Sequence, residues 1–145
     1  MRYNGLTRRY FESAAGVGIL AGPRVGRSAA GSRASGTWVQ FDIALDAESI
    51  AGLDVAATTT RRGMRIAAAR FLAFACPHTI AMAAWLVERS VGRPYCATLP
   101  ESVQAIAAQF ELPTEKLGRL LTIEDAWLAA GRAALGLAER GVTTS

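Results

Sequence analysis

The chain has 145 residues, of which 51% are hydrophobic and 19% charged, so it is long enough for one well-buried domain and short for two. Every stretch of 18 residues contains a charge, which argues against a membrane-spanning helix of about 20 apolar residues. Ten arginines against five acids give residues 1–70 a charge of +5, and the remainder carries −1. These cations are dispersed without interleaved aromatic residues, so nucleic-acid binding is not expected.

The chain opens with a helical pattern over residues 6–13 that contains Thr7-Arg8-Arg9-Tyr10-Phe11, a sequence similar to a twin-arginine export signal. The apolar stretch that follows is short and glycine-rich, which makes a weak signal. Glycine, proline and arginine then dominate residues 16–36. We expect this segment to be a flexible basic lead-in with at most a short strand.

Strand-forming residues are concentrated in three segments, Trp38–Leu45, Val55–Thr60 and Met64–Phe74, and Arg61–Gly63 supplies a turn between the last two. Their close spacing predicts an antiparallel meander. We expect Trp38 to lie in the core, together with Trp85 and Trp127.

Helical spacing of apolar residues begins after Cys76, because Pro77 suits a first helical position and the pattern continues to about residue 91. A second helix is expected over Glu101–Phe110, and a third from Pro113 to about Gly141 with one possible break. Strands followed by helices predict a single α+β domain over residues 1–145, with a small antiparallel three-stranded sheet and the helices packed on one face.

The chain has only two cysteines, Cys76 and Cys96, and one histidine, His78, which limits the chemistry that it can perform. A disulfide is one option, but reduced thiols are expected in a domain with this apolar content. One chain cannot assemble a four-ligand zinc site from Cys and His alone. A catalytic triad would have to use His78.

The segment Ala69–Ala81, A-R-F-L-A-F-A-C-P-H-T-I-A, resembles the central motif of the iron-sulfur cluster scaffold family of IscU and NifU. In that family a strand A-R-F-K-T-Y-G-C precedes a helix that begins G-S-A-I-A. Three further blocks follow the family order, at Tyr10–Gly18, Gly31–Thr37 and Leu112–Ala126, with an insertion near residues 47–62. The resemblance implies the IscU/NifU amino-terminal fold, and it favours a cytoplasmic protein because it places both early arginines in the first helix of the domain.

The resemblance also identifies what this chain has lost. The family holds a cluster with three cysteines helped by an aspartate or a histidine, and only the middle cysteine, Cys76, is present here. The other positions are occupied by Ser35, Thr37, Gly118 and Arg119. A guanidinium cannot ligate iron, so the usual cluster site is expected to be degenerate.

Cys76 has two interpretations of equal weight. It is either a reactive thiol, with a pKa lowered by the helix start and by Arg119, or a small packing residue. His78 is more readily a surface histidine than a metal ligand or base, although two chains of a homo-oligomer would each supply Cys76 and His78 to iron or a cluster. Cys96 is expected to be an ordinary loop cysteine.

The function that the resemblance implies is non-enzymatic: a divergent scaffold-like protein in iron-sulfur cluster assembly that docks to a cysteine desulfurase or other assembly proteins, with Cys76 carrying sulfur or one metal ligand. One alternative is a regulatory or interaction module that has lost iron and sulfur chemistry. The other is a distinct enzyme with Cys76 as its nucleophile.

Overall fold

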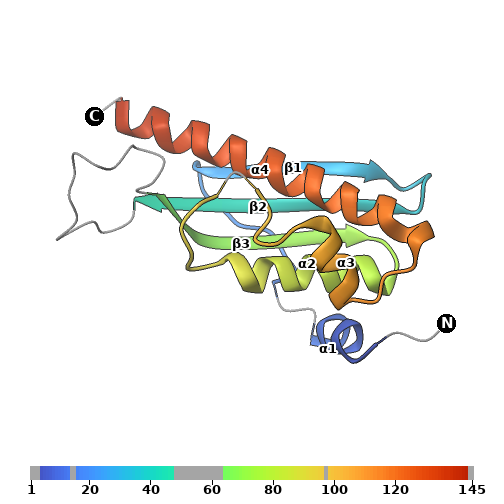
Figure 1. Cartoon of the computed structure of the whole chain (residues 1–145). Coiled ribbons are helices and arrows are strands. Elements are labelled where there is room, and N and C mark those ends of the chain that lie inside the picture. The colour runs from blue at the N-terminus through green and yellow to red at the C-terminus, as the bar shows by residue number, and fades with distance from the viewer. Residues whose placement is uncertain (1–3, 14–15, 48–63, 97, 144–145) are drawn as a thin grey trace.

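The computed structural model describes residues 4–13, 16–47, 64–96 and 98–143. The elements follow the order α1 (Gly5–Ser13), β1 (Val25–Ser32), β2 (Thr37–Ala47), β3 (Met64–Phe74), α2 (Pro77–Ser90), α3 (Val103–Gln109), a short 3₁₀ turn η3 (Thr114–Lys116) and α4 (Leu117–Thr143) (Figure 1). The α+β class is therefore confirmed. None of the helices in these ranges has the length and apolar character required to cross a membrane.

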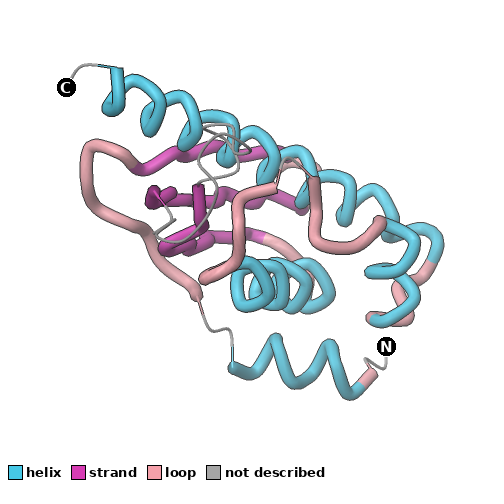
Figure 2. Tube along the Cα trace, turned by 60° about the vertical axis from the view of Figure 1, so that its left-hand side comes forward, coloured by secondary structure: helices cyan, strands magenta, loops and turns pink. Residues whose placement is uncertain are grey.

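The three strands form one antiparallel sheet in the order β1-β2-β3. The long helix α4 packs on β1 and β2, α2 packs on β3 on the same face, and α1 lies against α2 (Figures 1 and 2). The sheet and the two large helices thus form two layers, with the core between them.

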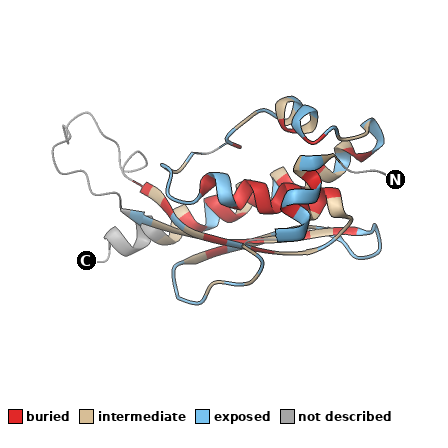
Figure 3. Cartoon of the chain, turned by 90° about the horizontal axis from the view of Figure 1, so that it is seen from below, coloured by how far each residue is buried: buried red, intermediate tan, exposed pale blue. Residues whose placement is uncertain are grey.

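Alternation along β2 explains this layering. Val39, Phe41 and Ile43 point toward the helices and are at most 1% exposed. The Phe41 ring meets Trp127 of α4 edge to face, with ring centroids 5.1 Å apart. Helix α2 is buried along most of its length, as the red ribbon in Figure 3 shows. Its own alanines and large apolar residues lie on nearly all sides of the helix, which is typical of a buried helix.

The opposite face of the sheet carries a buried carboxylate, Asp42, which is 1% exposed. Arg27 of β1 donates to Asp42 through Nε and Nη2, both at 2.8 Å, and the amide of Leu20 donates to its second oxygen at 2.9 Å. Burial by itself would raise the pKa of Asp42, but these hydrogen bonds and the charge of Arg27 lower it below the ordinary value. The chain before β1 is therefore fastened across this face.

The free edge of β3 is covered at two places by other segments of the chain. The amide of Gly18 donates to the carbonyl of Phe71, and the amide of Phe71 donates to the carbonyl of Gly16. Further along, the amides of Gly92 and Tyr95 donate to carbonyls near the start of β3. Backbone hydrogen bonds thus pair this edge near the start of β3 and at Phe71.

The lead-in prediction over residues 16–36 is wrong in its second half, because Val25–Ser32 forms a full edge strand. Its glycines serve packing: a Cβ at Gly26 would collide with the backbone of Ala134 in α4, so glycine permits the helix to approach the strand. The candidate strand Val55–Thr60 lies outside the described residues. The third strand of the sheet is β1, and β2 pairs directly with β3.

The tryptophan prediction holds for two residues and fails for one. Trp85 and Trp127 are each 3% exposed and belong to the core. Trp38 is only partly buried, because its side chain alternates with those of Thr37 and Val39 and points to the face without helices.

Candidate functional site around Cys76

Three segments meet at one end of the sheet: the turn between β1 and β2, the junction of β3 with α2, and the start of α4 (Figure 1). Cys76 occupies the junction as the N-cap of α2, with extended backbone angles of φ −77° and ψ 165°. Pro77 follows at the first helical position, where its missing N–H costs no hydrogen bond. The Cys76 thiol is half-buried, and its sulfur lies 3.5 Å from the hydroxyl of Thr79.

Arg119, in the first turn of α4, reaches this thiol. Its Nη1 donates to the Cys76 sulfur at 3.1 Å. Burial raises the pKa of Cys76, but hydrogen bonds from Thr79 and the charges of Lys116 and Arg119 outweigh it, so the pKa lies below the ordinary value. The sequence prediction that Arg119 neighbours Cys76 and lowers its pKa is confirmed.

His78, in the first turn of α2, is 2% exposed, so the expectation of a surface histidine is wrong. The Nζ of Lys116, itself 7% exposed, is 2.9 Å from His78 Nδ1. An ammonium group has only donors, so Nδ1 accepts and the ring carries its proton on Nε2. Burial and the charges of Lys116 and Arg119 lower the pKa of His78, which keeps the imidazole neutral at pH 7.

We call Cys76, His78, Thr79, Lys116 and Arg119 the thiol cluster. It combines a half-buried sulfur, a neutral imidazole, a hydroxyl and two basic side chains. Such surroundings stabilise an anion on sulfur, and the thiolate is the nucleophilic form of cysteine. The arrangement therefore suits nucleophilic chemistry at Cys76.

A metal ion or cluster does not fit the same position. The guanidinium of Arg119 already donates a hydrogen bond to the Cys76 sulfur, and it would repel a cation brought there. Ser35 in the turn between β1 and β2 turns its hydroxyl to backbone carbonyls, those of Ser32 at 2.9 Å and Thr37 at 3.3 Å. Within the described ranges, no three His, Cys, Asp or Glu side chains gather closely enough to hold a metal ion.

The remaining positions named by the resemblance contribute no strong ligand. Thr37 is 6% exposed at the start of β2, and Gly118 is exposed in the first turn of α4. The structure therefore brings Arg119 to Cys76 and Lys116 to His78, and it leaves the Ser35 hydroxyl bonded to its own turn.

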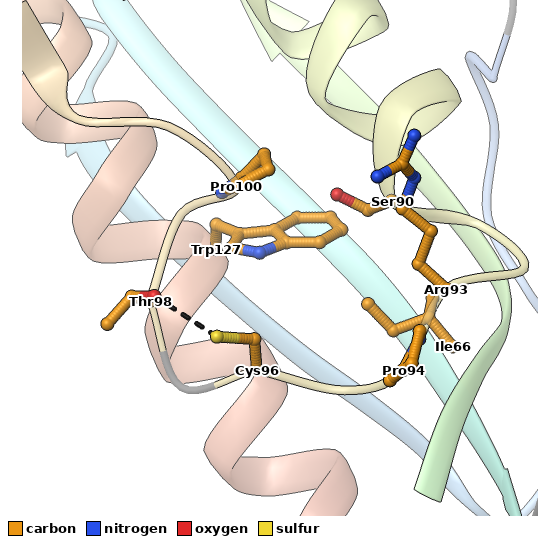
Figure 4. Close-up of a pocket in the computed structure, with 8 residues that line it drawn as sticks. All are labelled: Ile66, Ser90, Arg93, Pro94, Cys96, Thr98, Pro100 and Trp127. Atoms are coloured by element: carbon orange, nitrogen blue, oxygen red, sulfur yellow. Dashed lines mark hydrogen bonds between the residues drawn. The ribbon is translucent and has the colours of Figure 1, made fainter.

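Cys96 lies in a different part of the molecule. It is exposed in the loop after α2, and its sulfur is 3.2 Å from the hydroxyl of Thr98 (Figure 4). Both line a small hollow of about 50 Å³ with Trp127 and Pro100. No disulfide joins the two cysteines.

Two members of the thiol cluster escaped the sequence analysis as site residues, Thr79 and Lys116. Lys116 is the only lysine of the chain, among fifteen arginines, and it precedes Arg119 by three residues. Residues with this spacing lie on the same side of a helix, which was the available signal. Its contact with His78 depends on how α2 and η3 pack, and spacing does not reveal that.

Neither the protein-family models nor the curated proteins include a match to this chain.

Proposed function

We propose that the chain is a divergent scaffold-like protein of iron-sulfur cluster assembly that accepts sulfur on Cys76 from a cysteine desulfurase. The resemblance of residues 69–81 and of three further blocks to the IscU and NifU family supports the pathway. The position of Cys76 at the junction of β3 and α2 supports the choice of Cys76 as the residue that accepts sulfur.

The contact between Arg119 and the Cys76 sulfur is the observation on which this proposal chiefly rests. It favours sulfur over metal as the cargo, because a guanidinium stabilises an anionic thiolate or persulfide and repels iron. The lowered pKa of Cys76 supplies thiolate at pH values where an ordinary cysteine is mostly a thiol.

The transfer step is an exchange at sulfur. The Cys76 thiolate attacks the outer sulfur of the donor persulfide, R–S–S–H, and forms a new sulfur–sulfur bond. The donor bond breaks at the same time, and the donor cysteine leaves as a thiolate with the electron pair. Cys76 becomes Cys76–S–S–H, the proton stays on the transferred sulfur, and no oxidant or reductant is consumed.

The test is anaerobic incubation with a purified cysteine desulfurase and free cysteine, followed by intact-mass and peptide analysis. We expect one added sulfur atom on Cys76, none in Cys76→Ser, and undiminished transfer in Cys96→Ser. Iron and acid-labile sulfide are measured in the same samples after iron is added. Cys76-dependent iron and sulfide in stoichiometric amounts would instead indicate a cluster scaffold.

A second candidate, an interaction module without sulfur chemistry, is favoured by the loss of ligand residues at Ser35, Thr37 and Gly118. It predicts that the desulfurase binds the native protein and Cys76→Ser equally while Cys76 gains no sulfur. The same experiment, with binding measured beside transfer, separates the two candidates.

A further inference from the structure

An exposed apolar groove lies at the end of β3, where residues of β2 and β3 meet Phe11 of α1 and Ile80 of α2. We call it the Phe74 groove. Its volume is about 620 Å³, and its apolar lining includes Phe11, Val17, Trp38, Leu72, Phe74 and Ile80. Val17 is 53% exposed, Phe74 49% and Phe11 40%, so large apolar side chains face solvent together here. A cluster of this kind is typical of a binding surface.

The groove adjoins the reactive residue along the chain. Phe74 is the last residue of β3 and precedes Cys76 by two positions, and Ile80 lies in the first turns of α2. A partner seated against these side chains would therefore hold its own reactive group close to the Cys76 thiol. Proximity of this kind is what a transfer between two proteins requires.

The charge of the groove is positive. Among the described residues of its lining Arg33 is the one that carries a charge, and its guanidinium lies over the Phe74 ring, 5.6 Å from the centroid. Arg70 pairs in register with Asp42, so it lies on the same face of the sheet as Asp42, and its side chain is exposed there. The Asp42 carboxylate is already bonded to Arg27 and Leu20. A partner segment that carries carboxylates next to apolar side chains matches this combination.

We propose that the Phe74 groove seats an apolar, acidic segment of the cysteine desulfurase that donates sulfur to Cys76. This inference rests on the proposed function, and it adds the surface and the chemistry of recognition. Phe74 supplies apolar contact at the centre of the groove, and Arg33 selects a carboxylate beside it.

The experiment measures binding of the purified desulfurase to the full chain by titration calorimetry. Phe74→Ser and Arg33→Glu should each weaken binding at least tenfold, equivalent to about 1.4 kcal/mol. The matched controls are Val91→Ser, which removes another exposed apolar side chain, and Arg132→Glu, which reverses an exposed charge on α4. Both controls should bind within about twofold of the native chain, and added salt should weaken native binding.

Equal binding by the native chain, Phe74→Ser and Arg33→Glu overturns the proposal, as does absence of native binding. A native dimer that Phe74→Ser dissociates, measured by sedimentation, also overturns it, because a second copy would then occupy the groove. Sulfur transfer from a small donor, glutathione persulfide, is measured separately. If this donor labels Cys76 in every variant, the thiol is intact, and a loss of desulfurase binding is then a failure of docking. If Cys76 accepts sulfur from no donor, the proposed function itself is rejected.

Discussion

Asp42 and Cys76 are two anion-forming side chains that the fold treats alike electrostatically and differently in exposure. Arginine hydrogen-bonds both, Arg27 in one case and Arg119 in the other, and both have pKa values below the ordinary ones despite burial. Asp42 is 1% exposed beneath the chain that crosses the sheet, whereas the Cys76 sulfur is only half-buried at a junction between elements.

This difference separates a structural anion from a chemical one. The bonds to Asp42 join β1, β2 and the segment before β1, so their free energy stabilises the fold. The bonds to Cys76 come from α2 and α4, and this residue is only half-buried, so the bonds lower the energy of a nucleophile. Variants of the two sites should therefore change different measured quantities.

The largest expected effect on stability is that of Asp42→Asn, which removes the charge that Arg27 and Leu20 surround. We expect the free energy of unfolding at pH 7 to fall by about 1–3 kcal/mol in urea denaturation. The lowered pKa of Asp42 gives the native protein stability that is complete above the ordinary aspartate pKa and is lost as the pH falls through the lowered value. In the variant the free energy of unfolding should not show this loss at low pH. If the variant is as stable as the native protein at pH 7, Asp42 does not have the structural role described above.

Arg119→Leu should act on reactivity. Without the guanidinium the pKa of Cys76 rises, so alkylation of Cys76 by iodoacetamide near pH 7 should slow by up to about tenfold, the effect of one pKa unit. Arg119→Lys is the matched control, since it keeps a positive charge and should slow the reaction less. The pH profile of the rate distinguishes a shifted pKa from a blocked thiol, and an unshifted profile would contradict the prediction.

His78→Gln tests the buried contact between His78 and Lys116. Because the folded pKa of His78 is lowered, native stability is complete above the ordinary value of about 6.5 and declines as the pH falls toward the lowered value. This loss approaches about 1.4 kcal/mol per pH unit at most. The variant should show a flatter decline of the unfolding free energy between pH 7 and 5, measured by denaturation. A slope equal to that of the native protein would show that His78 does not cause the decline.

Cys96→Ala is expected to have the smallest effect. Cys96 is exposed in a loop, so its replacement should change the free energy of unfolding by no more than about 0.5 kcal/mol. The alkylation rate of Cys76 in this variant should equal that of the native chain. A slower reaction at Cys76 would show that the two thiols are linked, and the chemistry would then not be confined to one of them.

The sequence predicted much of the fold because apolar periodicity decides it locally. The helix from Pro77, the strand Met64–Phe74 and the order of strands before helices are confirmed. The strand Val25–Ser32 was missed because its glycines and small residues resemble loop composition. Glycine is needed at position 26 because α4 approaches the strand closely there. This is a long-range contact that no local pattern reveals.

The site was predictable in part, through the resemblance rather than through periodicity. Cys76 and Arg119 were identified together because the resemblance places each of them at a ligand position. The burial of His78 and its contact with Lys116 depend on the packing of α2 against η3. A single histidine in the first turn of a helix has the same local sequence whether it faces solvent or core, so the expectation of exposure failed.

The paired edge of β3 also limits the way in which another protein can bind. Gly16 and Gly18 cover this edge at Phe71, and Gly92 and Tyr95 cover its other end. A foreign strand seeking to extend the sheet would have to displace these segments first. Recognition at this edge therefore uses side chains in the manner of a groove and its ligand, and the same covering hinders strand addition by a second copy at Met64, Ile66 and Phe71.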